Sequence, residues 1–255
     1  MYFLGESNIY TLGNIGDHVV VSTKLSAVGS SRSAMISAGS ITTRLLGTFP
    51  GVEHVFIVGA GGGVPDLSDN KRGVRLGDVV ISAPSPNRGK DLHRSRETNE
   101  VEGFTVNSWI PDESAIESIY VAEGIKVLSE AGVCERFSFD RPPIETDIVT
   151  SKTKSQMEKN SLPLLHLGPI GAGRLVARVS MLRNEFARRY GVICFDAEFD
   201  AVVQSIFGNR IGSWALIRGI ADYVDGTKSK QWQPYAAMQS AAVLKTLLLN
   251  MPPQK

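Results

Sequence analysis

The chain has 255 residues, a formal net charge of +1, 42% hydrophobic residues and 21% charged residues. This composition is typical of a soluble globular protein, and large α/β domains of this length are often single. The basic residues are scattered, and the densest group, at residues 88–96, has acids close behind it, whereas a nucleic-acid groove needs a broader basic stripe, so we expect no nucleic-acid partner.

The first half of the chain alternates apolar runs with turn signals. We predict a hairpin, a helix, two buried strands and a second helix, at residues 8–24, 30–46, 55–58, 78–81 and 112–131. Ser30 or Ser31 is the expected N-cap of the first helix, and Asp112 that of the second. Between residues 83 and 111 the pattern dissolves into Pro, Gly and charge. Such long loops are usually functional or disordered, so we expect this segment at the site or at an oligomer interface.

In the second half, strands and helices alternate. The predicted order is strand, helix, strand, helix, strand and helix, at residues 164–167, 179–190, 193–195, 198–207, 214–218 and 233–249. This alternation implies a mostly parallel sheet between helical layers. We predict a single domain over residues 1–255, with a three-layer α/β/α fold and a mostly parallel mixed central sheet.

The two cysteines, Cys134 and Cys194, have neither CxxC spacing nor a paired histidine beside them. This argues against a disulfide framework and against a metal site. Cys194 stands in an apolar run and is expected to be a small core residue. The N-terminus has no signal pattern, and no apolar run approaches membrane-spanning length. We expect a reduced, cytoplasmic protein with no metal, no cofactor and no membrane partner.

A run of small residues, Gly59 to Gly63, follows the predicted strand at 55–58, with Asp78 downstream. The spacing resembles a dinucleotide-binding loop only weakly, because Val64 stands where a glycine is needed. The glycines would let backbone N–H groups approach a ligand at the strand end. The alternative is a tight turn that binds no ligand.

Two acids, Glu198 and Asp222, each come just after an apolar strand. In open α/β sheets ligands bind beyond the carboxyl ends of the strands, so both acids are candidate site residues. A reaction with a cationic transition state and a departing base would need two such carboxylates. The alternatives are that Glu198 only starts a helix, where the dipole favours an acid, and that Asp222 is a turn residue.

Five ordered motifs resemble the nucleoside phosphorylase-I superfamily, which contains purine and uridine phosphorylases and methylthioadenosine/S-adenosylhomocysteine nucleosidases. They lie at residues 58–65, 74–80, 168–173, 195–198 and 217–225, and the similarity covers nearly the whole chain. Residues 230–237 look like the version that is fused to signalling and immune proteins.

The resemblance implies a role for each acid. Asp222 would protonate or hydrogen-bond N7 of a purine, and such general acid catalysis is typically worth about 10²–10⁴-fold. Glu198 would accept hydrogen bonds from the 2′ and 3′ hydroxyls of the ribose and stabilise the developing sugar cation. The other residues expected to contact substrate are Ala197, Phe195, Val176, Gly59, Ala60, Gly61 and Arg218.

Departures from the family pattern disfavour phosphorolysis. Family phosphorylases bind phosphate with an arginine and with a serine or threonine, which here are Ile57 and Ala60. A phosphate bound here would lack the bidentate contact of the arginine guanidinium and the hydrogen bond from the hydroxyl group. Ala197 replaces a methionine, and Val176 replaces a phenylalanine that stacks on the base, so a roomier pocket is expected.

Family members also begin with a strand bearing an acid that activates water, and we expect this chain to open at the hairpin that normally comes second. Either a segment is missing, or another group activates water, or the protein binds without cutting. The first hypothesis is a metal-independent purine nucleosidase acting on a nucleoside or nucleotide. The alternatives are a phosphorylase with an unrecognised phosphate site and a catalytically inactive nucleotide-binding or scaffold module. The resemblance implies a homo-oligomer, and the basic group at residues 88–96 could hold a 5′-phosphate.

Overall fold

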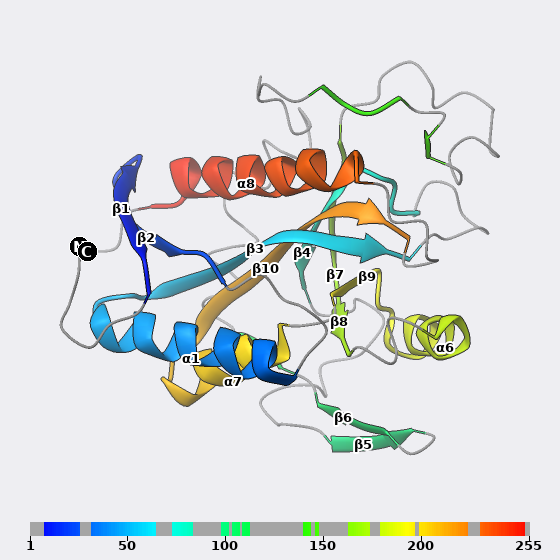
Figure 1. The fold of residues 1–255 in the computed structure, drawn as a ribbon, viewed down its shortest axis with the longest axis horizontal. Helices are drawn as coiled ribbons and strands as arrows, with labels where there is room; N and C mark the ends of the chain where they lie inside the picture. The colour runs from blue at the N-terminus through cyan, green and yellow to red at the C-terminus, as the bar shows by residue number, and fades with distance from the viewer. Residues whose placement is uncertain are drawn as a thin grey trace.

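The computed structural model describes residues 8–25, 32–64, 73–83, 98–101, 104–107, 109–112, 140–143, 146–147, 163–173, 179–196, 199–223 and 230–252. Within these residues the main feature is a six-stranded sheet in the order β7-β4-β10-β3-β9-β8 (Figure 1). Its strands are β3 (His54–Gly63), β4 (Val79–Ser82), β7 (Leu165–Gly168), β8 (Ile170–Ala172), β9 (Cys194–Asp196) and β10 (Ser213–Asp222). The helices described are α1 (Arg32–Thr48), α6 (Ser180–Tyr190), α7 (Asp200–Gly208) and α8 (Trp232–Asn250).

The sheet is mixed, as predicted. Among the described strands, β10 runs parallel to β3, β4 parallel to β7 and β8 parallel to β9. The β10–β4 and β3–β9 pairs are antiparallel. The long central pair, β10 and β3, therefore carries its carboxyl ends to the same edge of the sheet.

Strand β10 is buried on both faces, which explains its apolar run from Trp214 to Ile217. Ala215 and Ile217 pack toward α8 in one core cluster, together with residues of β4. Trp214 and Leu216, which alternate with them, pack toward α1 and α7 in a second cluster. Because successive side chains of a strand point to opposite faces, this alternation produces the predicted layers, with α8 on one side and α1 and α7 on the other (Figure 1).

The predicted N-terminal hairpin is confirmed. Strands β1 (Tyr10–Ile15) and β2 (His18–Thr23) pair antiparallel around a turn in which Gly16 has a φ of 56°. His18 Nε2 lies 3.0 Å from the carbonyl oxygen of Met251. This contact attaches the hairpin to the segment that follows α8.

Two sequence expectations about irregular segments are wrong. The glycine run does not follow a strand but forms the second half of β3, because residues 59–62 pair with β10 and Gly62 and Gly63 also pair with β9. The segment at 83–111, expected to lack regular structure, contains the hairpin of β5 (Thr98–Val101) and β6 (Phe104–Asn107). Local antiparallel pairing needs only a few residues per strand, too few for a clear pattern in so polar a sequence.

The boundary of α7 also differs from the prediction. The helix begins at Asp200, with Phe199 at the N-cap position, and not at Glu198. The acid that the helix dipole favours in the first turn is thus Asp200. Ala197, Glu198, Val176, the basic group at 88–96 and, apart from Asp112, the helix predicted at 112–131 lie outside the described residues. No helix in the described part of the chain is long and apolar enough to cross a membrane.

Candidate functional site

The register of the central strands brings two predicted site residues, Asp222 and Phe195, into one row. Asp222, the last residue of β10, pairs with Gly62 of β3, and Gly62 pairs on its other side with Phe195 of β9. A register shift between Ile220 and Asp222 marks a bulge just before the acid. Since neighbouring strands lie about 4.8 Å apart, the backbones of Asp222 and Phe195 are roughly 10 Å apart, and the strand between them presents only a glycine.

Asp222 is partly buried and stands in the chain between two buried residues, Ala221 and Tyr223. Ile220 and Ala221 just before it are 0% and 6% exposed, while Asp222 itself is only partly buried. Because Asp222 is partly buried beside these residues, its carboxyl group is less hydrated than one in open solvent. An acid in such surroundings interacts more strongly with a nearby ligand than one in open solvent.

The glycines of β3 differ in what they allow. A Cβ atom on Gly61 would lie 2.9 Å from Cys194 Sγ and 3.3 Å from the Phe195 carbonyl oxygen, so close packing against β9 requires glycine there. Gly59 would meet only Arg218 Nη1, at 3.8 Å. In the described residues β3 pairs with β9 only at Gly62 and Gly63. On the side that faces β9, the backbone of Gly59, Ala60 and Gly61 is therefore not part of that ladder. Their binding of substrate through backbone groups remains a prediction.

Arg218 is a buried arginine that ties three strands together. It is 4% exposed, and its Nε donates to Asp196 Oδ2 at 2.8 Å. Its Nη1 donates to the carbonyl oxygen of Ile57 at 2.6 Å. The ion pair anchors the end of β9 two residues before Glu198. In the part of the chain that is described, the second terminal nitrogen, Nη2, has no protein acceptor.

Asp196, the partner of Arg218, is a residue that the sequence reasoning did not assign to the candidate site. It stands directly before the predicted contacts Ala197 and Glu198. The clustering of acids at that strand end was a signal, but its arginine partner is 22 positions away in sequence. Only the pairing of β9 and β10 on either side of β3 brings the two charges together.

Phe195 and Cys194 belong to the core. Phe195 is 2% exposed, and a Cβ atom on Gly171 would lie 2.6 Å from its ring. Its contact with substrate therefore remains a prediction. Cys194 is 0% exposed, which confirms the expected core role, and burial raises the pKa of its thiol far above the usual value. A thiol kept neutral in this way is a poor nucleophile.

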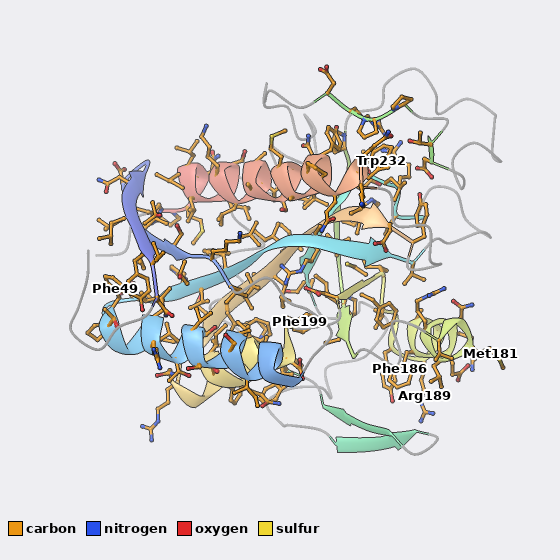
Figure 2. The ribbon with its side chains drawn as sticks, viewed as in Figure 1. Phe49, Met181, Phe186, Arg189, Phe199 and Trp232 are labelled. Carbon is orange, nitrogen blue, oxygen red and sulfur yellow. The ribbon has the colours of Figure 1, made fainter. Side chains whose placement is uncertain are left out.

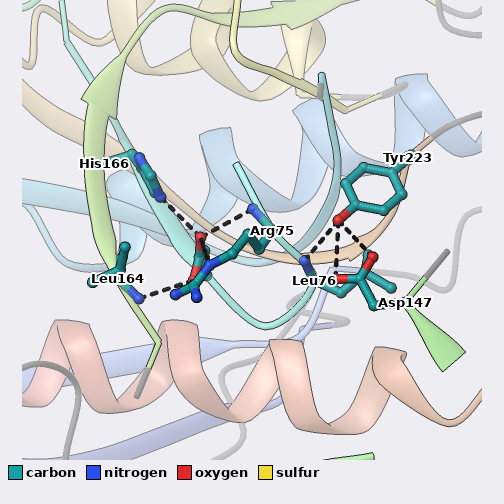
Figure 3. Close-up of polar contacts among 7 residues, drawn as sticks. Arg75, Leu76, Asp147, Leu164, His166 and Tyr223 are labelled. Carbon is teal, nitrogen blue, oxygen red and sulfur yellow. Dashed lines mark hydrogen bonds and ion pairs between the residues drawn. The ribbon is translucent and has the colours of Figure 1, made fainter. Parts of the chain in front are cut away.

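A second polar centre lies on the other side of β10, around the fully buried carboxylate of Asp78. Figure 3 labels the three residues that surround it, Arg75, Leu164 and His166. Arg75 donates to it from its backbone nitrogen at 3.0 Å and from Nη2 at 3.1 Å. His166 Nε2 lies 2.9 Å from Oδ2, and the backbone nitrogen of Leu164 donates to Oδ1 at 2.9 Å. Burial alone raises the pKa of Asp78, but the His166 hydrogen bond and the Arg75 charge outweigh it, so the pKa lies below its usual value.

We expect Asp78→Asn to lower the free energy of unfolding by about 3 kcal/mol at neutral pH, because a buried ion pair loses one partner. The depressed pKa means that Asp78 stabilises the fold above pH about 4 and that this contribution is lost as pH falls through the folded-state value. Urea denaturation between pH 3 and 7 should therefore show a flatter acid limb for the variant. Glu185→Gln, which removes the exposed pair with Arg188, is the control and should change little. Parallel acid limbs for Asp78→Asn and wild type would contradict the prediction.

No group of three or more His, Cys, Asp and Glu side chains that could hold a metal ion occurs among the described residues.

No family model matches the chain. A curated relative, the nucleotide-binding leucine-rich repeat (NLR)-like protein of Hyaloscypha variabilis, is 30% identical over 274 residues, covering 98% of this chain and 26% of the relative. The chain thus spans about a quarter of that relative's length.

Solved structures of nucleosidases share the fold. The 5′-methylthioadenosine/S-adenosylhomocysteine nucleosidase of S. pneumoniae, with the transition-state inhibitor MT-ImmA, has a TM-score of 0.57 and 19% identity and covers 99% of this chain and 89% of its own. The S-adenosylhomocysteine nucleosidase of Streptococcus pyogenes, with 5-methylthiotubericidin, has a TM-score of 0.60 and 15% identity and covers 97% and 86%. An aspartate-to-asparagine variant from Helicobacter pylori, with 5′-methylthioadenosine in its active site, has a TM-score of 0.58 and 14% identity and covers 95% and 85%. The chain has the fold of these nucleosidases.

Proposed function

We propose that this domain binds a purine nucleoside or nucleotide at the carboxyl end of β10 and hydrolyses its N-glycosidic bond without a metal. The observation that carries the proposal is the position of Asp222, at the end of the central strand of a fold shared with nucleosidases. The row from Asp222 through Gly62 to Phe195 supports it, because the strand beside the acid presents no side chain that would obstruct a ligand.

The reaction needs a proton for the base and an oxygen nucleophile for the sugar. As the C1′–N9 bond breaks, its electron pair leaves with the purine, and Asp222 donates its proton to N7. Water then adds its oxygen to C1′, and the proton that the water loses restores the acid. Glu198 would hold the 2′ and 3′ hydroxyls and stabilise the positive charge on the ribose.

Water is favoured over phosphate as the nucleophile because the glycine strand offers no charged anion site. Ile57, where phosphorylases of the superfamily place an arginine, is 6% exposed and packs in the cluster with α1 and α7. Ala60 has no hydroxyl group. The guanidinium of Arg218 already donates from Nε to Asp196 and from Nη1 to the Ile57 carbonyl oxygen, so it cannot present both terminal nitrogens to an anion. Phosphate would thus lack the bidentate cationic contact that usually binds it.

A panel of substrates tests the proposal. Adenosine, its 5′-monophosphate, 5′-methylthioadenosine and S-adenosylhomocysteine are incubated with the purified protein, with and without phosphate. Free base should appear from at least one of them without phosphate. Release that depends on phosphate would replace hydrolysis with phosphorolysis, and binding without release would point to the scaffold alternative.

The scaffold alternative has its own support. The relative that is 30% identical is an NLR-like protein about four times as long as the matching region. In such a context the domain would bind a purine compound without cleaving it. The same panel separates the two functions, because binding measured by calorimetry with no base released is expected only of the scaffold.

A further inference from the structure

A buried hydrogen-bond cluster holds the residue that follows Asp222. The Tyr223 hydroxyl donates to Asp147, with its oxygen 2.9 Å from Oδ1 and 3.1 Å from Oδ2 (Figure 3). The backbone nitrogen of Leu76 donates to the same hydroxyl at 3.2 Å. Tyr223 is 4% exposed and Asp147 is 1% exposed. A buried acid and a buried phenol have thus been placed next to the candidate catalytic residue.

The tyrosine hydroxyl is a permanent donor in this position. Burial, with the charge of Asp147 as a further cause, raises the pKa of Tyr223 well above its usual value. The hydroxyl stays protonated at every physiological pH, so it can donate to Asp147 while accepting from Leu76. The hydrogen bonds therefore act as a fixed connection and not as a titrating switch.

Two further hydrogen bonds attach the same end of β10 to the turn at 75–78, and a third attaches residue 146 to α8. The backbone nitrogen of Gly77 donates to the Ile220 carbonyl oxygen, and the Ile220 nitrogen donates to the Asp78 carbonyl oxygen, both at 2.8 Å. Trp232, at the start of α8 (Figure 2), donates from Nε1 to Thr146 Oγ1 at 2.9 Å. The turn at 75–78 and residues 146–147 thus hold the strand end from outside the ladder with β3.

We propose that Tyr223 and Asp147 are positioning residues that hold the carboxyl end of β10 and, through it, the Asp222 side chain. The catalytic consequence rests on the proposed function, whereas the anchoring of the strand end does not. The strand needs such an anchor because the register shift before Asp222 interrupts its regular pairing with β3. Displacement of a reacting group by about 1 Å can lower a rate by roughly 10²-fold.

Three variants and one control test the anchor. Tyr223→Phe removes the hydroxyl but keeps the ring, Asp147→Ala removes the acceptor, and Asp147→Asn keeps an acceptor oxygen. Thr42→Val removes a similarly buried hydrogen bond, from Thr42 to the Ala38 carbonyl oxygen in α1, far from β10's end. Hydrogen exchange by mass spectrometry on peptides spanning residues 219–223 should be about fivefold faster or more in Tyr223→Phe and Asp147→Ala. Asp147→Asn and Thr42→Val should stay close to wild type.

Kinetics on the substrate found in the panel then tests the effect on Asp222. For Tyr223→Phe and Asp147→Ala, kcat should fall about tenfold while KM changes less than twofold, and Asp147→Asn should recover most of the rate. If Tyr223 and Asp147 only stabilised the fold, their variants would lose activity by having a smaller folded fraction, and Thr42→Val would show the same loss. Unchanged exchange at 219–223 overturns the proposal whether or not the protein is an enzyme, and so does faster exchange with an unchanged kcat. If wild type releases no base but exchange is faster in the two variants, the proposed function fails and the anchoring role is supported.

Discussion

Replacing Asp222 with asparagine should lower base release by roughly 10²-fold or more while ground-state binding changes little. Asparagine keeps the shape and one acceptor oxygen, but it cannot deliver a proton to the departing purine. The neighbouring core residues Ile220 and Ala221, which are 0% and 6% exposed, keep the surroundings apolar in both proteins. The loss should therefore fall on kcat and not on the dissociation constant.

The measurement is steady-state release of free base, paired with calorimetric binding of the same ligand. Asp17→Asn changes an exposed acid in the turn between β1 and β2 and is the matched control. Wild-type rates in Asp222→Asn would rule out the proposed acid. An inert wild type that still binds ligand would instead favour the scaffold function.

The second large effect is expected at Gly219, three residues before Asp222. A Cβ atom at this position would collide with the backbone carbonyl group of Ala236, because α8 lies directly on β10 there. A backbone group cannot swing aside as a side chain can, so either the helix or the strand must move. We expect Gly219→Ala to lower the free energy of unfolding by about 3 kcal/mol, as overpacking in a rigid core does.

Urea denaturation of Gly219→Ala measures this cost, and Gly47→Ala is its control. Gly47 lies within α1, and an added Cβ would have no neighbouring atom within 4 Å. Gly47→Ala should therefore leave the free energy of unfolding unchanged or raise it by up to about 1 kcal/mol. The destabilisation at Gly219 should also lower base release, since a shift of β10 moves Asp222. Equal denaturation midpoints for Gly219→Ala and wild type would show that α8 does not contact β10 as described.

The acid at the end of β10 could be found from the sequence because its signal is local. An unbroken apolar run from Trp214 to Ile217 indicates a strand buried on both faces, and Asp222 comes where such a strand ends. The structure confirms the strand and extends it to Asp222 itself. The alternation of strands and helices likewise predicts the layered fold, since each apolar face must be covered.

The glycine run shows where local signals mislead. Glycines usually interrupt strands, so residues 59–63 were interpreted as a loop at the strand end. In the structure they continue β3, because Gly61 allows contact with Cys194 and Gly63 lies against Ile220. Both neighbours are distant in sequence, and no local pattern contains that information.

The sequence by itself predicted most of the long elements, the layered α/β class and the acid at the end of β10, because periodicity and turn chemistry involve neighbouring residues. Only the tertiary structure decided which polar groups meet. Three polar contacts join residues that are far apart in the sequence: Arg218 and Asp196 are separated by 22 positions, Tyr223 and Asp147 by 76, and His166 and Asp78 by 88. Strand order and register bring these polar groups into contact, and the packing of the whole core determines both the order and the register. Buried charges and hydroxyl groups then pair because an unpaired polar group in that core would cost too much free energy.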